Sequence, residues 1–236
     1  LSIEIKNEGD IVCLLGPSGI GKTTILRTIA GLEKLENGEI ILKDKVISSN
    51  NQHLEPEKRK IALSFQENSL FPHHSIHKNI ILGIPKSGPK KINVEEITKF
   101  LNIDHILHKY PHQISAGEAQ RVSLARSLCA EPDLLLLDEP LSNIDQNFKE
   151  EIQAKLKKII KDLKITTIIV THDSYEAFYL GDMCGILLDK KLKQFDNPYN
   201  VYHIPNSIEV VKFLNRGVLV PAKVTSPKSL ENEELG

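Results

Sequence analysis

A glycine-rich loop between an apolar run and a helical segment limits what this chain can fold into more than any other feature. The loop is Gly16-Pro17-Ser18-Gly19-Ile20-Gly21-Lys22-Thr23, followed by Thr24, and it fits the pattern G-x-x-x-x-G-K-[ST]. Glycines let the backbone wrap phosphate groups closely, because a Cβ would collide with them. Lys22 adds a positive charge for the outer phosphates, and the Thr23 hydroxyl suits Mg²⁺, which prefers oxygen ligands. This phosphate loop, Gly16–Thr23, predicts a site for a nucleoside triphosphate with Mg²⁺.

The composition is that of an ordinary globular chain. The 236 residues are 40% hydrophobic and 26% charged, and the formal net charge is −1, so no overall field favours nucleic acid or an anionic membrane. No apolar run approaches the roughly 18 residues of a membrane span, and the start does not read as a signal peptide. Three scattered cysteines lack metal or disulfide spacing, so we expect Cys13, Cys129 and Cys184 to be reduced and buried in a cytosolic setting.

Hydrophobic periodicity predicts strands alternating with helices. The predicted strands are Leu1–Lys6, Ile11–Leu15, Gly38–Lys43, Ile61–Phe65, Leu134–Leu137, Thr166–Val170 and Gly185–Leu188. The predicted helices are the segment after the phosphate loop to about Ala30, Val94–Leu101, Ser115–Cys129, Lys149–Leu163 and Ile208–Leu214. This alternation predicts an α/β core with a mainly parallel sheet.

Two carboxylates follow the apolar run Leu134–Leu137. Ligands bind at the carboxyl ends of the strands in open parallel sheets, which is where Asp138 and Glu139 should lie. We expect Asp138 to hold Mg²⁺ through water. Glu139 is placed to act as a general base that polarises a water for attack on the γ-phosphate.

Two further polar residues end predicted strands. His172 follows Thr166–Val170 and could orient the attacking water, although a lone histidine is usually structural. Gln66 follows Ile61–Phe65 and could ligate Mg²⁺ through its amide oxygen, although a glutamine by itself signals almost nothing.

A second anion site is predicted at Ser115. Ser115 with Glu118 forms a capping box, and Gly117 lies beside this helix start. The amides of such a helix start attract anions. One ATP needs only one such site, so the economical explanation is two copies that meet face to face, each offering this site to the other's ATP.

In this order the motifs resemble those of the ATP-binding subunit of an ABC transporter, over about residues 1–215. The phosphate loop matches Walker A, Gln66 the Q-loop, Leu134–Glu139 Walker B and His172 the switch histidine. Ile114–Gln120 resembles the signature segment, and Ser142-Asn143-Ile144-Asp145 resembles the D-loop.

The resemblance implies a fold and its divisions. The fold class is α/β: a P-loop NTPase core of the ABC ATPase type with a mainly parallel sheet, an antiparallel β subdomain and a helical signature subdomain. The ATPase domain would cover residues 1–218, with the helical subdomain at about 68–130. Residues 219–236 would form a C-terminal tail that could begin a β-rich regulatory domain.

The resemblance also implies partners. Two copies would close head to tail, so that Ser115, Gly117 and Glu118, with Asp145 of the D-loop, contribute to ATP sites. Transmembrane permease subunits would dock near Leu70-Phe71-Pro72, and a substrate-binding protein would take part indirectly. The chain would be peripheral, on the cytoplasmic face of the inner membrane, with no nucleic-acid partner.

Three departures from the family pattern stand out. Ala116 replaces a usual glycine, and Glu118 replaces a usual glutamine, which adds a negative charge near a γ-phosphate and could slow hydrolysis. The aromatic residue that stacks on adenine usually precedes the segment matching Leu1, so we expect an N-terminal truncation.

The sequence leaves the transported substrate open. The segments around Tyr110–Ser115 and Tyr199–Tyr202 resemble the subfamily for ferric iron, polyamines, sugars, sulfate or molybdate. Asn143 and the segment Phe213–Leu219 lean towards ferric iron.

Three other readings compete with these predictions. One is an ABC ATPase that acts on nucleic acid, although the chain lacks the long insertion or second ATPase domain of such proteins. Another is a regulatory subunit that binds ATP and hardly hydrolyses it, motivated by Ala116 and Glu118. Finally, His73, His74 and His77 could suggest a metal site, but without acidic or cysteine neighbours a solvated or partner-facing loop is favoured.

Overall fold

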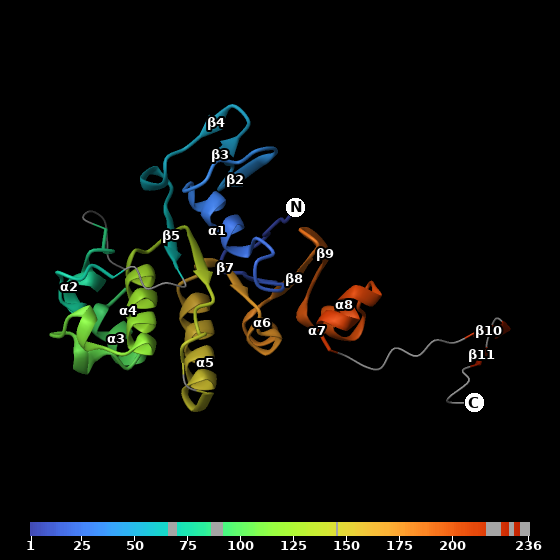
Figure 1. Cartoon of the computed structure of the whole chain (residues 1–236). Coiled ribbons are helices and arrows are strands. Elements are labelled where there is room, and N and C mark those ends of the chain that lie inside the picture. The colour runs from blue at the N-terminus through green and yellow to red at the C-terminus, as the bar shows by residue number, and fades with distance from the viewer. Residues whose placement is uncertain (66–69, 86–91, 145, 216–222, 227–228, 232–236) are drawn as a thin grey trace.

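The computed structural model describes residues 1–65, 70–85, 92–144, 146–215, 223–226 and 229–231. A six-stranded sheet lies at its centre, in the order β5-β6-β7-β1-β8-β9 (Figure 1). The strands are β1 (Ile11–Leu15), β5 (Ile61–Ser64), β6 (Leu134–Asp138), β7 (Thr166–Thr171), β8 (Met183–Leu188) and β9 (Lys191–Asp196). From β5 to β8 the neighbours pair in parallel, and β9 pairs antiparallel with β8.

Other strands form separate antiparallel sheets. One sheet, seen at the top of Figure 1, contains β2 (Glu39–Leu42), β3 (Lys45–Ser49) and β4 (Gln52–His53). Near the C-terminus β10 (Lys223–Ser226) pairs with β11 (Ser229–Glu231). The predicted combination of a mainly parallel sheet with an antiparallel one is confirmed.

Helices alternate with many of these strands along the chain. They are α1 (Lys22–Ala30), α2 (Ile76–Ile81), α3 (Val94–Phe100), α4 (Ala116–Cys129), α5 (Gln146–Asp162), α6 (Ser174–Leu180), α7 (Pro198–His203) and α8 (Ile208–Phe213). Short 3-10 turns occur at Pro56–Lys58, Asp104–Ile106 and Pro111–Gln113. Helices α2, α3 and α4 lie together at one side of the molecule in Figure 1. They fall within the predicted helical subdomain, whose boundaries stay a prediction, as does a β-rich domain after residue 219.

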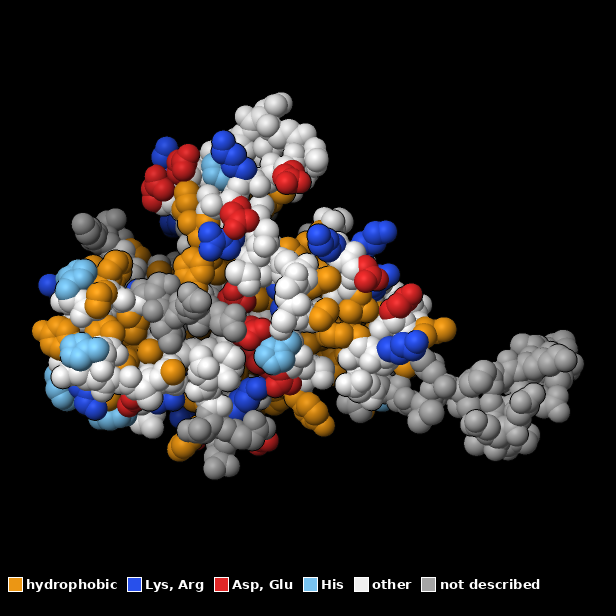
Figure 2. Space-filling view, viewed as in Figure 1, with side chains coloured by type: hydrophobic (Ala, Val, Ile, Leu, Met, Phe, Trp, Pro, Cys, Tyr) orange, Lys and Arg blue, Asp and Glu red, His pale blue; other side chains and the backbone are white. Residues whose placement is uncertain are grey.

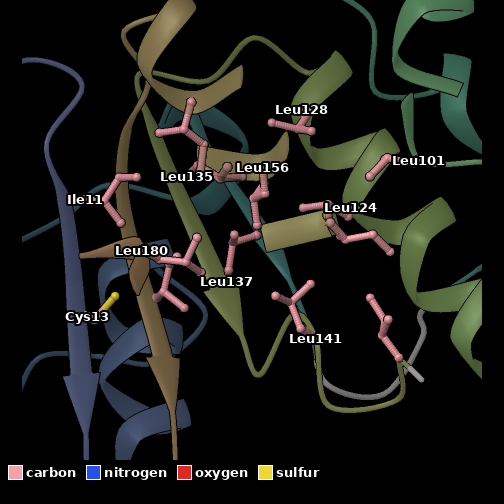
Figure 3. Packing of buried hydrophobic residues seen from close by; sticks show 14 of the residues in the cluster. Ile11, Cys13, Leu101, Leu124, Leu128, Leu135, Leu137, Leu141, Leu156 and Leu180 are labelled. Carbon is pink, nitrogen blue, oxygen red and sulfur yellow. The ribbon is translucent and has the colours of Figure 1, made fainter. Parts of the chain in front are cut away.

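The apolar strands supply two cores, because successive side chains of a strand point to opposite faces of the sheet. In β1, Ile11, Cys13 and Leu15 join a large cluster with α4, α5 and α6, part of which Figure 3 shows. Val12 and Leu14 join a smaller cluster with α1 on the other face. This two-sided burial explains why the strand reads as a continuous apolar run rather than an alternating one.

The prediction of a strand at Leu1–Lys6 is wrong. Leu1 is exposed, and no strand is assigned between residues 1 and 10. Ile3 and Ile5 are partly buried against the smaller core. Their alternation therefore records packing of one face onto the core, which does not require a hydrogen-bonded ladder.

The cysteines behave as predicted. Cys13, Cys129 and Cys184 are free and buried. Burial raises the pKa of Cys129 to about 12, so the thiol stays protonated at neutral pH. In the described part of the chain, no helix combines the length and apolar character that a membrane crossing requires.

A buried arginine joins the smaller antiparallel sheet to α1. Arg59 is 4% exposed. Its guanidinium donates to Ile29 O at 2.8 Å, near the carboxyl end of α1, and to Leu54 O at 2.6 Å. It also donates to Ile47 O and to Ser48 Oγ in β3. The cation therefore holds the helix that begins at the phosphate loop against the antiparallel sheet, and its charge suits a helix C-terminus.

We expect Arg59→Met to lower the free energy of unfolding by about 3 kcal/mol, because several buried carbonyl groups lose their donor. Urea unfolding followed by circular dichroism measures this loss. The control is Lys58→Met, because the side chain of the neighbouring Lys58 is exposed. Equal unfolding free energies for the two variants would contradict the role assigned to Arg59.

Candidate active site

The phosphate loop, Asp138, Glu139 and His172 meet at one edge of the main sheet. Strands β6, β7 and β1 are consecutive and parallel, with Asp138 paired to Val170 and Leu15 paired to Thr171. The phosphate loop follows Leu15, and His172 follows β7. Because parallel strands end at the same edge, three segments distant in sequence converge on one place.

The backbone of the phosphate loop requires glycine at two positions. Gly19 has φ +79° and Gly21 has φ +104°, and an added Cβ at either would meet nothing within 4 Å. The backbone conformation by itself therefore favours glycine at both positions. Gly21 is also the N-cap of α1 and provides no side-chain cap, so the first amides of the helix remain available to an anion.

Lys22 is buried inside this loop. It is 7% exposed, and its Nζ donates to Gly16 O at 2.7 Å and to Pro17 O at 3.1 Å. Burial lowers the pKa of Lys22, against the opposing effects of Glu139 and Asp138. The loop thus holds a positive charge at its centre, which suits phosphate groups.

The phosphate loop contacts β6 directly. Thr23 Oγ1 donates to Asp138 Oδ2 at 2.8 Å, and Asp138 is 4% exposed. Burial raises the pKa of Asp138, the Thr23 hydrogen bond lowers it, and Glu139 raises it further. A hydroxyl and a carboxylate side by side are hard oxygen donors, so this pair fits Mg²⁺. Gln66, the third predicted ligand, lies outside the described residues.

Glu139 occupies an unusual backbone conformation. Its φ is +46°, which is uncommon for a residue with a side chain and is often found at functional sites. Two hydrogen bonds hold this turn: Glu139 N donates to Val170 O at 2.9 Å, and Gln120 Nε2 donates to Glu139 O at 2.7 Å. The Glu139 side chain is 12% exposed, and its Oε1 lies 3.0 Å from Nδ1 of the more exposed His172. With a proton on Nδ1, the ring donates to the carboxylate.

The predicted capping box is confirmed at the start of α4. Ser115 N donates to Glu118 Oε2 at 2.7 Å, and Glu118 N donates to Ser115 Oγ at 3.2 Å. The bond from the Ser115 amide, the largest cause, lowers the pKa of Glu118 and keeps it ionised. The negative charge of Glu118 therefore lies against the Ser115 amide at the start of α4.

Gly117 is required by the D-loop. A Cβ added at Gly117 would lie 2.7 Å from Asn143 O. Within the described part of the chain, no hydrogen bond or ion pair joins Ser115, Gly117 or Glu118 to the phosphate loop. Asp145 of the D-loop lies outside the described residues.

Gln120 forms a bridge between α4 and the turn at Glu139 that the sequence does not predict. This buried side chain of α4 donates to Glu139 O and to Ser142 Oγ, and its Oε1 accepts from Asn143 N at 3.0 Å. It thereby joins the signature helix to the turn at Glu139 and to the D-loop. Its place at the end of the segment Ile114–Gln120 was the only signal in the sequence.

The histidine loop after Phe71 holds no metal cluster in the described residues. The rings of His73 and His74 lie 4.2 Å apart and pack near Phe71. Within the described ranges, no group of three or more histidine, cysteine or acidic side chains could hold a metal ion.

The chain matches a known protein family over more than half of its length. A family model described as ABC transporter matches residues 1–142, which include the phosphate loop, the signature segment and Glu139. The chain belongs to this family.

Curated members of the family show substantial identity. The chain is 38% identical over 220 residues to the Fe(3+) ions import ATP-binding protein FbpC 2 of Haemophilus influenzae, covering 92% of this chain and 62% of that protein. It is 38% identical over 219 residues to the xylose/arabinose import ATP-binding protein XacK of Haloferax volcanii, covering 91% of this chain and 56% of that protein. The chain thus spans about three fifths of the length of these relatives.

Solved structures agree with the fold. The ATP-binding cassette MJ0796, in a dimeric post-hydrolysis state bound to ADP and Pi, matches with a TM-score of 0.72 and 30% identity, covering 83% of this chain and 88% of that chain. CbiO1 of Clostridium perfringens, part of an ABC transporter complex, matches with a TM-score of 0.73 and 28% identity, covering 90% of this chain and 86% of that chain. The predicted ABC ATPase fold is confirmed.

We expect Gln120→Leu to lower the free energy of unfolding by about 2 kcal/mol, because the Asn143 amide loses its acceptor and the Glu139 carbonyl loses one of its donors. The local effect is faster hydrogen exchange of the Asn143 amide, measured by NMR. The control is Gln113→Leu, because the Gln113 side chain accepts from Tyr110 N within a short 3-10 turn. Unchanged exchange at Asn143 would contradict the bridge.

Proposed function

We propose that this chain hydrolyses ATP to power substrate import through separate transmembrane permease subunits of an ABC transporter. The observation that carries the proposal is the Thr23–Asp138 hydrogen bond at the sheet edge, with Glu139 and His172 beside it. A triphosphate-binding loop, a pair of hard oxygen donors and a carboxylate next to a histidine are the groups that phosphoryl transfer to water uses.

The phosphate loop would bind the triphosphate through its backbone amides and Lys22. Lys22 now donates to carbonyls of the loop itself and is therefore already centred where phosphates would lie. Thr23 and Asp138 would hold Mg²⁺, with Gln66 as a further ligand. When bound, Mg²⁺ neutralises charge on the phosphate oxygens.

Glu139 would take the proton from the attacking water. Glu139 directly follows Asp138, the residue that accepts a hydrogen bond from Thr23 Oγ1. His172, which contacts Glu139 Oε1, would orient this carboxylate and the water. The hydrogen bonds on both backbone groups of Glu139 limit its freedom, as general-base catalysis requires.

A second copy of the chain would complete each ATP site. Ser115 and Ala116 are exposed at the start of α4, so an anion from outside the chain could approach this helix N-terminus. The ionised Glu118 is bonded to the Ser115 amide, which reduces its repulsion of a phosphate. The dimeric state of MJ0796, to which this chain is similar, supports this arrangement.

The permease subunits would dock on the side of α2. Phe71 is 45% exposed and Leu82 is 51% exposed, an apolar surface for docking. Figure 2 shows hydrophobic and histidine side chains gathered over this side of the molecule. The buried Asn79 holds this surface in shape, because its side chain bonds both the N and the O of Phe71.

We infer a place on the cytoplasmic face of the inner membrane, where ATP and the permease are both accessible. Ferric iron is the favoured substrate, because Asn143 and an iron-import relative point to it. Sugar import is the alternative, since a xylose/arabinose-import relative has the same 38% identity. A substrate-binding protein would deliver the substrate to the permease.

We expect Glu139→Gln to lower kcat for Mg-dependent ATP hydrolysis by at least about 100-fold while ATP binding persists, because the amide cannot accept the proton of water. Phosphate release measures kcat, and a fluorescent ATP analogue measures binding. The control is Glu96→Gln, which removes an exposed carboxylate from α3. Turnover retained in Glu139→Gln would contradict the role of Glu139.

We expect the chain to purify with membrane permease subunits when it is expressed together with its neighbouring transport genes. Mass spectrometry of the tagged complex identifies them. Leu82→Asp should reduce the recovered permease about tenfold, because a charge enters the apolar surface, whereas Lys45→Asp, on exposed β3, should not. Recovery of no membrane subunit would contradict the importer assignment, and a sugar permease would overturn ferric iron alone.

A further inference from the structure

A buried carboxylate lies beneath the loop that carries His172. Glu176, in the first turn of α6, is 2% exposed, and its Oε2 accepts a hydrogen bond from Thr171 Oγ1 at 3.2 Å. Its Oε1 has no hydrogen-bond partner among the residues that the structure describes. A buried acid with an unpartnered oxygen is costly, so its presence calls for an explanation that the proposed function does not supply.

One ammonium group connects this acid to α5. Lys149 Nζ donates to Asp173 Oδ2 at 2.6 Å and lies 3.8 Å from Glu176 Oε2. Lys149 follows the D-loop by a single helical turn. The ammonium therefore lies between two carboxylates, one on each side of the start of α6.

The same contacts fix both neighbours of His172. Asp173 N donates to Thr171 Oγ1 at 3.1 Å, while the Asp173 side chain caps α6 by accepting from Tyr175 N and Glu176 N. Burial raises the pKa of Asp173, but the bonds from Lys149 and these amides outweigh it, so the pKa is lowered and Asp173 stays ionised. Thr171, His172 and Asp173 are consecutive, so whatever holds the first and third sets the position of the second.

We propose that Glu176 is a positioning residue for hydrolysis: in its ionised form it holds Lys149 and Thr171, and thereby keeps His172 beside Glu139. This inference rests on the proposed ATPase function. A neutral side chain at this position would accept from Thr171 but would not attract the ammonium. Lys149 would then be held from one side only, and the loop would gain freedom.

The charge of Glu176 changes near neutral pH. Burial raises its pKa to about 7, against the opposing effects of Lys149 on α5 and the Thr171 hydroxyl on β7. The carboxylates of Asp173 and Glu139 also face Glu176 and raise its pKa. Cys13 of β1 interacts electrostatically with Glu176 as well. The positioning contact is therefore present above pH of about 7 and lost as the pH falls through this value.

Stability changes in the opposite direction. Between the ordinary pKa of a glutamate and about 7, the unfolded chain has released the proton of Glu176 and the folded chain retains it. The unfolded state then binds fewer protons, so the free energy of unfolding falls as the pH rises through this window. Above it the fold contains a buried charge, which a neutral substitution removes. Replacing a residue that aids hydrolysis at a cost to stability lowers activity and raises stability. Replacing a merely structural residue lowers both, so the two roles can be distinguished.

The test compares the unsubstituted protein with Glu176→Gln at pH 6 and pH 8. Glutamine mimics the protonated acid, so we expect kcat values within about twofold at pH 6 and a loss of about fivefold or more at pH 8. At pH 8 the same variant should unfold about 2–4 °C higher, because the buried charge is gone. Mg-dependent phosphate release and thermal unfolding by circular dichroism measure the two effects.

Two further variants complete the test. Lys149→Met should lower kcat at pH 8 as much as Glu176→Gln, and the double variant should lose no more than either single one, because the two act as a unit. Glu150→Gln removes an exposed carboxylate from the same helix and should change neither kcat nor the unfolding temperature.

A full kcat for Glu176→Gln at pH 8 would overturn the inference, and so would a variant that loses kcat and unfolding temperature together. Absence of turnover in the unsubstituted protein would contradict the proposed function instead. In that event, equal unfolding temperatures of Glu176→Gln and the unsubstituted protein at pH 8 would still contradict the claim that Glu176 is a buried charge at this pH.

Discussion

The parallel pairing of β6, β7 and β1 is the constraint on which the site depends. Parallel neighbours must end at the same edge of the sheet, and the register puts Asp138 opposite Val170 and Leu15 opposite Thr171. The phosphate loop, the acidic turn and His172 therefore follow three neighbouring strands at the same edge of the sheet. Each strand lies about 5 Å from the next. Burial on both faces keeps this edge fixed, because alternate side chains of each strand belong to two different cores. Without this pairing, the contacts between Thr23 and Asp138 and between Glu139 and His172 would not form.

Polar side chains then connect this edge to the rest of the molecule. Gln120 joins α4 to the turn at Glu139 and to the D-loop, and Arg59 joins α1 to the smaller antiparallel sheet. Each makes several hydrogen bonds from a buried position, so neither can shift without leaving carbonyl or amide groups unpaired. A displacement of α4 would therefore disturb the backbone of Glu139.

Buried charge is concentrated at the same edge. Lys22, Asp138 and Glu176 are each less than a tenth exposed, and burial is the largest cause of the pKa shift of each. Such groups lower the stability of a fold unless they are fully paired. The strained backbone of Glu139 lies among them. The local departures from a stable apolar interior therefore gather where the proposed chemistry occurs, as is expected of a functional site.

Features that depend on neighbouring residues could be predicted from the sequence. The glycines of the phosphate loop, the capping box of Ser115 and Glu118, and the apolar strands follow from local conformation and periodicity, and the structure contains each of them. Contacts between groups that are distant in the sequence could not be predicted, because they depend on the tertiary packing. The Thr23–Asp138 bond joins residues 115 positions apart, and the partners of Gln120 and Glu176 lie on other elements. Periodicity misled at Leu1–Lys6, where side chains pack without a ladder. The spacing of residue types predicts the local backbone conformation. Hydrogen bonds across the sheet and the burial of charge depend instead on how the whole chain packs.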